Sequence, residues 1–234
     1  IEPGAELDGF TIGECVHQGG MATLWTVTHP GISVPMLMKI PRVSEGEDPA
    51  AIVSFEMEQM IVPRLAGPHV PGCFGTGDFD RQAYVVVERI PGKTLLGRLS
   101  ELPLPYEEAR VIAGMIATAL ADLHRQSVIH HDIKPSSIMF RPSGECVLID
   151  FGLSHHNQLP DLLQEEFRLP YGTAPYMAPE RLLGVRAAGV VVPRSIALLP
   201  RSLQLLDQAR VRHRAGGVLG ERADRGGTVH FGGC

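Results

Sequence analysis

His130-His131-Asp132-Ile133-Lys134-Pro135-Ser136-Ser137 is the most informative stretch in this chain of 234 residues. Asp150-Phe151-Gly152 begins 18 residues after Asp132, and Ala178-Pro179-Glu180 stands further on. An Asp-Phe-Gly tripeptide by itself is more often an ordinary turn than a site. Three short motifs in this order and at these separations are much more specific than any one of them.

Together these motifs resemble the signature series of a bacterial (Hanks-type) serine/threonine protein kinase. Gly172-Thr173-Ala174-Pro175-Tyr176-Met177-Ala178-Pro179-Glu180 is also similar to the bacterial form of the family's substrate-docking segment. The resemblance covers residues 9–180 and implies an α+β, two-lobed protein-kinase-like fold with a complete N-lobe and an incomplete C-lobe. We expect the N-lobe at 1–90, a partial C-lobe with the catalytic and activation loops at 91–186, and an atypical basic tail, predicted to be disordered, at 187–234.

Composition favours a reduced compartment. The four cysteines are widely separated and form no Cys-x-x-Cys pair that would suggest zinc or redox chemistry. No apolar run approaches the roughly 18 residues of a membrane span, and the N-terminus lacks the order of a signal peptide. We therefore expect a cytoplasmic protein without a membrane segment. The chain begins at Ile1 instead of Met and is shorter than the roughly 250 residues of a complete kinase domain, which favours a fragment.

Charge is divided unevenly along the chain. Residues 1–180 contain 23 Asp or Glu and 12 Lys or Arg, whereas residues 181–234 contain 3 and 9. A basic end of this kind can bind nucleic acid or a membrane surface. Here it contains no lysine and one aromatic residue, Phe231, so we expect no specific nucleic-acid partner. A working nucleic-acid arm is a third, less favoured hypothesis, and it requires salt-dependent binding that disappears when residues 187–234 are deleted.

Apolar periodicity predicts the main elements. Val34 to Ile40 and Tyr84 to Glu88 are apolar runs between Gly and Pro turns, and we expect them to be strands of an antiparallel sheet. Ala51 to Leu65 has the spacing of a helix that packs on this sheet, and Pro105 to Gln126 that of a helix in the second lobe. The buried face of the second helix is predicted to carry Ile112, Ile116, Leu120 and Leu123.

The resemblance implies transfer of the γ-phosphoryl group of ATP to a Ser or Thr hydroxyl of a protein. Such a transfer needs charged groups that hold ATP in line and neutralise its oxygens, and little covalent chemistry. Lys39 matches the strand lysine that holds the α- and β-phosphates, and Glu58 matches its helix partner; without the motifs, both would be interpreted as surface charges. Asp132 matches the catalytic aspartate, which accepts the hydroxyl proton. Lys134 corresponds to the phosphate-facing lysine of serine/threonine kinases, which tyrosine kinases usually lack.

Mg²⁺ is the second implied cofactor. Asp150, at the end of a predicted strand from Cys146 to Ile149, matches the aspartate that holds Mg²⁺, and carboxylate oxygen suits this hard cation. Ser137 stands at the position of the asparagine that holds a second Mg²⁺. Its shorter side chain predicts a looser second metal and lower activity. Phe151 and His130 are expected to pack together beneath Asp150.

Gly19 and Gly20 belong to the predicted phosphate-covering loop. The family's Gly-x-Gly-x-x-Gly pattern keeps only its middle glycine in His17-Gln18-Gly19-Gly20-Met21-Ala22. Glycine allows close approach to a ligand and positive φ. We therefore expect Ala22 and His17 to bend the loop or weaken its binding of the phosphates. A simple surface role for His17 is the favoured interpretation.

Five further residues are expected to contact the nucleotide. Leu37 replaces the family's alanine and Leu24 its valine, and both would narrow the adenine slot. Overpacking costs roughly 1 to 3 kcal/mol, so we expect weakened ATP affinity. Glu88 and Ile90 belong to the predicted hinge between the lobes, whose backbone binds adenine, and Met139 is expected to line the slot.

His131 replaces the arginine that in many kinases receives a phosphate of the activation loop. Between Leu153 and Tyr171, Ser154 is the only hydroxyl residue. The acceptor of the phosphate and its cationic receiver are therefore both largely absent. We expect a kinase that is not switched by phosphorylation of this loop.

The family pattern fails after Glu180. Kinases of this family continue with a buried helix whose aspartate holds the catalytic loop, but no acidic residue occurs between Arg181 and Leu206, and Ile196 stands at the expected place. A reading-frame change or truncation near residue 185 is favoured over a divergent C-terminus. The main hypothesis is a serine/threonine kinase with a protein substrate, and the alternative is a nucleotide-binding pseudokinase or scaffold. The substrate protein and the oligomeric state stay unknown.

Overall fold

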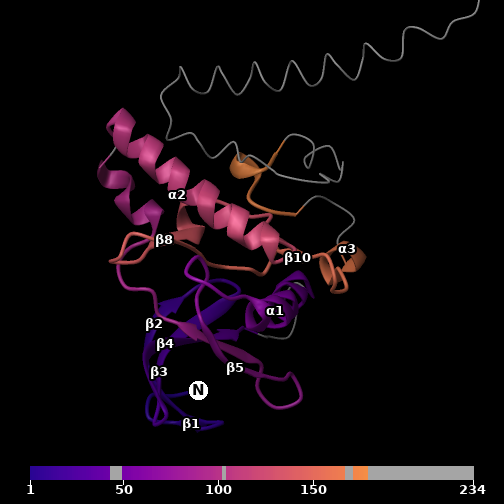
Figure 1. The fold of residues 1–234 in the computed structure, drawn as a ribbon. Helices are drawn as coiled ribbons and strands as arrows, with labels where there is room; N and C mark the ends of the chain where they lie inside the picture. The colour runs from indigo at the N-terminus through magenta and orange to yellow at the C-terminus, as the bar shows by residue number, and fades with distance from the viewer. Residues whose placement is uncertain (43–48, 102–103, 167–170, 179–234) are drawn as a thin grey trace, which may run out of the picture.

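The computed structural model describes residues 1–42, 49–101, 104–166 and 171–178. The expectations for Pro179-Glu180, and those for residues 181–234, lie outside the described residues. The molecule has two lobes, one above the other, with the N-terminus at the far end of the first (Figure 1). Within the described ranges, no helix has the length and apolar character that crossing a membrane would require.

The first lobe is built on a six-stranded sheet in which every neighbouring pair is antiparallel. Both predicted strands are present in it, and they pair with each other. In spatial order the strands are β1 (Glu6–Leu7), β2 (Phe10–Gln18), β3 (Ala22–His29), β4 (Ile32–Pro41), β6 (Tyr84–Glu88) and β5 (Cys73–Gly77).

Alternation along β4 gives the sheet two different faces. Met36 and Met38 are buried and pack with apolar side chains of β2, β3 and β6. Leu37 and Lys39 lie on the opposite face and are half-buried. Val85, which pairs with Lys39, belongs to the core that includes helix α1 (Pro49–Ile61). The second face of the sheet is therefore the one that meets α1.

The helix predicted between residues 51 and 65 is present but ends earlier than expected. Helix α1 stops at Ile61 and is followed by the 3₁₀ turn η1 (Val62–Arg64), in which Pro63 occupies one of the first two positions. Proline has no backbone N–H and its ring clashes with the preceding turn, so it ends an α-helix. Leu65 is buried beyond this turn and still belongs to the core.

The second lobe combines one long helix with short hairpins and turns. Its elements are η2 (Leu95–Glu101), α2 (Tyr106–Arg125), β7 (Val128–Ile129), η3 (Pro135–Ser137), β8 (Ile138–Phe140), β9 (Cys146–Leu148), β10 (His155–His156), α3 (Leu162–Glu166) and η4 (Ala174–Tyr176). β8 pairs with β9, and β7 with β10. The strand predicted to lead into Asp150 is confirmed as β9.

Helix α2 lies within one residue of its predicted bounds at each end. Acidic side chains occupy its first turn and basic ones its last, which matches the helix dipole. Of the predicted apolar face, Ile112 and Leu123 are buried. Ile116 and Leu120 are only half-buried and pack at the margin of the same core.

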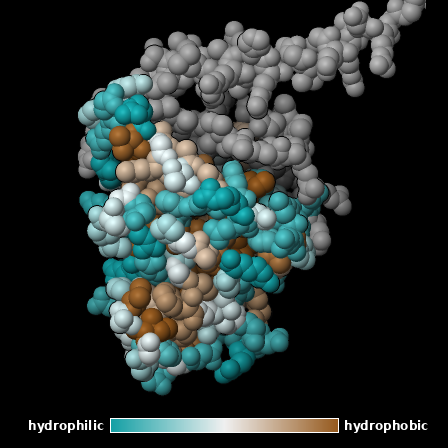
Figure 2. Space-filling model, in the orientation of Figure 1, coloured by the Kyte–Doolittle hydropathy of each residue, from teal (hydrophilic) through white to brown (hydrophobic). Residues whose placement is uncertain are grey.

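One apolar core joins the two lobes. Met57 and Ile61 of α1 are fully buried in the same cluster as Leu123 of α2, Leu148 of β9 and Phe151. On the face seen in Figure 2 the second lobe is mainly hydrophilic, and hydrophobic residues gather over the strands of the first lobe. The lobes are thus connected through α1 as well as through the chain.

Candidate active site

Lys39 lies between two carboxylates that come from different lobes. Its Nζ is 2.5 Å from Oε2 of Glu58 and 3.2 Å from Oδ1 of Asp150. Lys39 stands on β4, Glu58 on α1, and Asp150 follows β9. The predicted Lys39–Glu58 pair is therefore present, and the same amine also reaches the acid predicted to hold Mg²⁺.

Burial and the shared charge set the protonation of this cluster. Burial opposes the charged amine, but the carboxylates of Glu58 and Asp150 outweigh it and raise the pKa of Lys39. Burial raises the pKa of Glu58 against the attraction of Lys39. The ammonium of Lys39 lowers the pKa of Asp150 despite burial. The lowered pKa favours the ionised form of Asp150, and 49% of its side chain is exposed, so a cation can reach it.

Asp150 has left-handed backbone, with φ of 69°. Such a conformation is uncommon outside glycine and costs about 1 kcal/mol or more, so surrounding contacts must hold it. Phe151 is buried at 1% exposure, and its ring centroid lies 5.1 Å from that of His130, as predicted. A Cβ on Gly152 would lie 2.4 Å from Oγ of Ser54 and 3.2 Å from the carbonyl oxygen of Ser54, so only glycine fits there.

Asp132 is held from two sides. Lys134 Nζ lies 2.5 Å from its Oδ2, and the backbone N–H of Thr173 donates to its Oδ1 at 3.0 Å. Lys134 Nζ also donates to the hydroxyl of Thr173 at 3.0 Å. Asp132, at 6% exposure, is buried, and the two predicted catalytic residues meet at the segment predicted to dock the substrate.

Ser137, which the resemblance predicts to hold a second Mg²⁺, is enclosed in the catalytic loop. The residue has 0% exposure, and its hydroxyl forms hydrogen bonds with the backbone of Asp132 and Lys134. The carboxylate of Asp150 is exposed, and carboxylate oxygen is the ligand that Mg²⁺ prefers.

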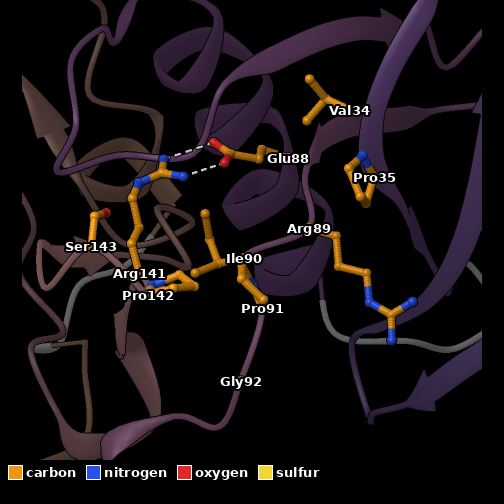
Figure 3. Close-up of a pocket in the computed structure, with 10 residues that line it drawn as sticks. All are labelled: Val34, Pro35, Glu88, Arg89, Ile90, Pro91, Gly92, Arg141, Pro142 and Ser143. Atoms are coloured by element: carbon orange, nitrogen blue, oxygen red, sulfur yellow. Dashed lines mark hydrogen bonds and ion pairs between the residues drawn. The ribbon is translucent and has the colours of Figure 1, made fainter.

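The predicted hinge follows β6. The backbone N–H of Glu88 donates to the carbonyl of Gly72, and that of Arg89 to the carbonyl of Pro35. The carboxylate of Glu88 contacts the guanidinium of Arg141 through both of its oxygens, as Figure 3 shows. Arg141 lowers the pKa of Glu88 through these hydrogen bonds.

A depression of about 700 Å³ lies beside the hinge (Figure 3). It is lined by Val34, Pro35, Glu88, Arg89, Ile90, Pro91, Gly92, Arg141, Pro142 and Ser143. Glu88 and Ile90 are thus brought together there, but Leu24, Leu37 and Met139 do not line it. We conclude that this depression is not the predicted adenine slot.

The side chains predicted to narrow that slot share one face of the sheet. Leu24 of β3 is paired directly with Lys39, and Leu37 of β4 is paired with Val87 of β6. Both leucines are half-buried. Met139 lies on β8 in the second lobe and is also half-buried.

Gly19 and Gly20 form the turn between β2 and β3. Neither glycine has positive φ. The N–H of Gly19 donates to the carbonyl of Ala22, and the guanidinium of Arg42 donates to the carbonyl of Gly19. A Cβ atom added to Gly20 would have no other described atom within 4 Å, so there is space beside this residue for a ligand.

His131 and Ser154 lie near each other without forming a phosphate site. His131 has φ of 65°, and its ring centroid lies 6.4 Å from that of His155 and 6.5 Å from that of Tyr171. The hydroxyl of Ser154 is fully buried and donates to the carbonyl of His130. A kinase could not reach this hydroxyl without local unfolding, which supports the expectation of no switching at Ser154.

Sequence reasoning missed two residues of this region. The sequence assigns Thr173 no role of its own within the docking segment, and its contacts with Asp132 and Lys134 are seen only in the structure. Arg141 carried no signal, because a single arginine after a short strand is ordinarily a surface charge.

The comparisons with known proteins agree with this geometry. Residues 10–192 match the protein kinase domain family. Since this is more than half of the chain, the chain belongs to that family. Its fold also resembles the crystal structure of the Mycobacterium tuberculosis PknI kinase domain, with a TM-score of 0.59, 22% identity, and coverage of 80% of this chain and 70% of that one.

The relatives in sequence are bacterial serine/threonine kinases. The chain is 28% identical over 182 residues to the probable serine/threonine-protein kinase PknB of Lactococcus lactis, covering 77% of this chain and 29% of that protein. It is 27% identical over 191 residues to PknF of Mycobacterium tuberculosis, covering 79% of this chain and 40% of that protein. The chain spans about 30% of the length of the first three such relatives. By family it is a protein kinase domain.

Proposed function

We propose that this chain transfers the γ-phosphoryl group of ATP to Ser or Thr hydroxyls of a protein substrate. The observation that carries the proposal is the contact of Lys39 with both Glu58 and Asp150. A strand, a helix and a loop from two lobes meet at this amine, and phosphoryl transfer depends on such positioning of charge.

Each charged residue then has a distinct task. Glu58 orients the ammonium of Lys39, which would hold phosphate oxygens, and Asp150 would hold Mg²⁺. When bound, ATP supplies the phosphoryl group and Mg²⁺ neutralises charge on its oxygens. Asp132 would orient the substrate hydroxyl and accept its proton, while Lys134, 2.5 Å from Asp132, would stabilise the transferring group.

The nucleotide would lie against residues of both lobes. Gly19 and Gly20 would cover its phosphates, and Leu24 and Leu37 would lie on one side of adenine. Met139 would lie on the other side, with the backbone of Glu88 and Ile90 at the edge. The support for this arrangement is the shared face of Leu24, Leu37 and Lys39 on the sheet.

Asp132→Asn tests the proposal. The change keeps the size of the side chain but removes the base and one of the two oxygens that accept from Lys134 and Thr173, so transfer of labelled phosphate from ATP to a Ser/Thr-containing peptide mixture should fall about 10²- to 10⁴-fold. Asp80→Asn, at an exposed acid of the first lobe, is the matched control. Equal transfer by the Asp132→Asn chain and the unsubstituted chain would contradict the assigned role.

A pseudokinase is the second candidate, favoured by the enclosure of the Ser137 side chain in the catalytic loop. It would bind nucleotide without turnover. A thermal shift with Mg-ATP and no measurable transfer by the unsubstituted chain would select it. Transfer that depends on Asp132 would exclude it.

A further inference from the structure

The hydroxyl of Ser137 is enclosed by the backbone of the catalytic loop. It accepts a hydrogen bond from the N–H of Lys134 at 3.0 Å, and it lies 3.0 Å from the carbonyl oxygen of Asp132 and 2.9 Å from that of Lys134. The loop between these residues forms the 3₁₀ turn η3, which starts after Lys134. Three backbone groups of the catalytic loop thus surround one oxygen atom.

The hydrogen-bonding capacity of a hydroxyl decides which of these contacts it uses. Serine has one proton to donate and two lone pairs that accept. The carbonyl of Lys134 already accepts from the N–H of Ser137 at 2.9 Å. The carbonyl of Asp132 is therefore the acceptor that most needs the hydroxyl proton, since a buried polar group without a partner is unfavourable.

This arrangement conflicts with metal ligation by Ser137. At 0% exposure, no part of the Ser137 side chain is open to solvent, from which a metal ion would have to bind. To turn toward a metal, the hydroxyl would have to release the N–H of Lys134 and the carbonyl of Asp132 together. A neutral hydroxyl is also a weaker partner for Mg²⁺ than the carboxylate of Asp150.

The two backbone groups that the Ser137 hydroxyl joins belong to Asp132 and Lys134, the residues proposed to act in phosphoryl transfer. The Asp132 carboxylate and the Lys134 amine meet at 2.5 Å, and this contact needs the two backbone segments to keep their relative position. The N–H of Ile149 donates to the carbonyl of Ser137, so the tie also continues to the strand end that bears Asp150.

We infer that Ser137 is a positioning residue of the catalytic loop and not a ligand of a second metal ion. The catalytic part of this inference rests on the proposed function. The Ser137 hydroxyl joins the backbone of Asp132 to that of Lys134. The nucleotide complex of this chain would then contain one divalent cation, held by Asp150.

Amide hydrogen exchange tests the tie without any ligand. In Ser137→Ala the N–H of Lys134 loses its acceptor, and its exchange should become about 5- to 10-fold faster. Ser136→Ala is the matched control, because Ser136 is the half-buried neighbour of Ser137 in the same 3₁₀ turn η3. Unchanged exchange at Lys134 in Ser137→Ala would overturn the inference, whatever the chain catalyses.

The number of bound metal ions tests the part of the inference that excludes a second metal ligand. It is measured first on the unsubstituted chain and then on Ser137→Ala. With ADP saturating, Mn²⁺ titrated by electron paramagnetic resonance should reach one tightly bound ion per chain, and Ser137→Ala should keep that number and its affinity. Two ions in the unsubstituted chain, one of them lost in Ser137→Ala, would show ligation and overturn the inference.

Kinetics separate positioning from mere stability. If transfer occurs, Ser137→Ala should lower kcat about 10-fold or more and leave KM for Mg-ATP unchanged, since the tie acts on Asp132 and not on nucleotide binding. A raised KM with unchanged kcat would contradict the assignment. If the unsubstituted chain transfers no phosphate, the proposed function fails and the exchange experiment still decides the role of Ser137.

Discussion

Leu37 shows how one side chain can set the affinity of the proposed nucleotide slot. It is half-buried, paired with Val87, and on the same face of β4 as Lys39. A leucine at this place fills space that a smaller residue would leave to adenine. The burial pattern of β4 confirms the predicted face, whereas the effect on ATP stays a prediction.

Leu37→Ala should therefore tighten Mg-ATP binding. Relief of overpacking by roughly 1 to 3 kcal/mol corresponds to an affinity gain on the order of 10-fold. Isothermal titration measures it, with Val111→Ala as a control that shortens an exposed apolar side chain on α2 in the second lobe. Equal affinity in all three chains would discard the idea.

His130 is a second residue whose environment determines its behaviour. Burial lowers the pKa of its imidazole. Nε2 lies 3.0 Å from the carbonyl of Ile149, and the N–H of Asp132 donates to Nδ1. These contacts require a neutral ring with its proton on Nε2, because a protonated ring could not accept at Nδ1.

Stability should therefore decrease as pH falls below about 6.5. The unfolded chain binds a proton at His130 near its ordinary pKa of 6.5, while the folded chain resists it until lower pH. Between pH 7.5 and 5.5 the resulting loss of unfolding free energy is at most about 1.4 kcal/mol, the value for a folded ring that binds no proton in this range. Urea unfolding at both pH values measures it, and His130→Phe should remove that part of the slope. An unchanged slope would contradict a neutral, buried His130.

At the scale of elements, Arg141 ties the hinge to two other segments. Its guanidinium contacts both carboxylate oxygens of Glu88, and it donates to the carbonyls of Pro68 and Val70. Its charged partner stands at the end of β6, and the two carbonyls lie before β5. The hinge, the segment before β5 and the turn after β8 are therefore held together at one point.

Arg141→Ala should lower the free energy of unfolding by about 2 kcal/mol. Removing one member of a buried pair typically costs about 3 to 5 kcal/mol, but nearly a fifth of each side chain is exposed and solvent screens the pair. Arg141→Lys keeps the charge but not the bidentate contact with Glu88, so it should lower the free energy of unfolding by less than Arg141→Ala. Urea denaturation measures all three chains, and equal midpoints would show that the tie contributes nothing.

The same pair predicts a pH dependence. Because the folded pKa of Glu88 is lowered from its ordinary 4.5, its stabilising contribution is present above that value and is lost as pH falls through the folded pKa. Glu88→Gln should therefore reduce the fall in stability between pH 5 and pH 3. An identical acid profile in both chains would contradict this contribution.

At the scale of the whole molecule, the core shared by the lobes predicts a single unfolding transition. Met57 of α1 is fully buried in the cluster that includes Leu123 and Phe151 of the second lobe. Elements that pack into one core lose that packing together, which makes their unfolding cooperative. Trp25, the only tryptophan, reports on the sheet, and far-ultraviolet circular dichroism reports largely on α1 and α2.

The two signals should change at the same urea concentration. Met57→Ala should lower the unfolding free energy by about 2 to 5 kcal/mol and shift both signals together, since the cavity lies in the common core. A tryptophan transition separate from the helical one would show that the lobes unfold independently.

Much of this protein follows from its sequence because the informative patterns are local. Apolar runs between Gly and Pro turns predicted the strands that the structure contains as β4 and β6. Helical spacing predicted α1 and α2 to within a few residues. The order of the motifs placed Lys39, Glu58, Asp132 and Asp150 in one site, and the structure brings the first two into contact.

Only the tertiary structure decided contacts whose partners are distant or whose rotamers are set by packing. Ser137 shares a sequence position with a metal ligand, but the surrounding backbone turns its hydroxyl inward. Arg141 reaches Glu88 across 53 residues, a pairing that no local pattern contains. The left-handed backbone of Asp150 likewise depends on Phe151 packing into a core built from both lobes. Local periodicity determines which face a side chain occupies, whereas the folded chain alone determines which atoms meet within about 3 Å.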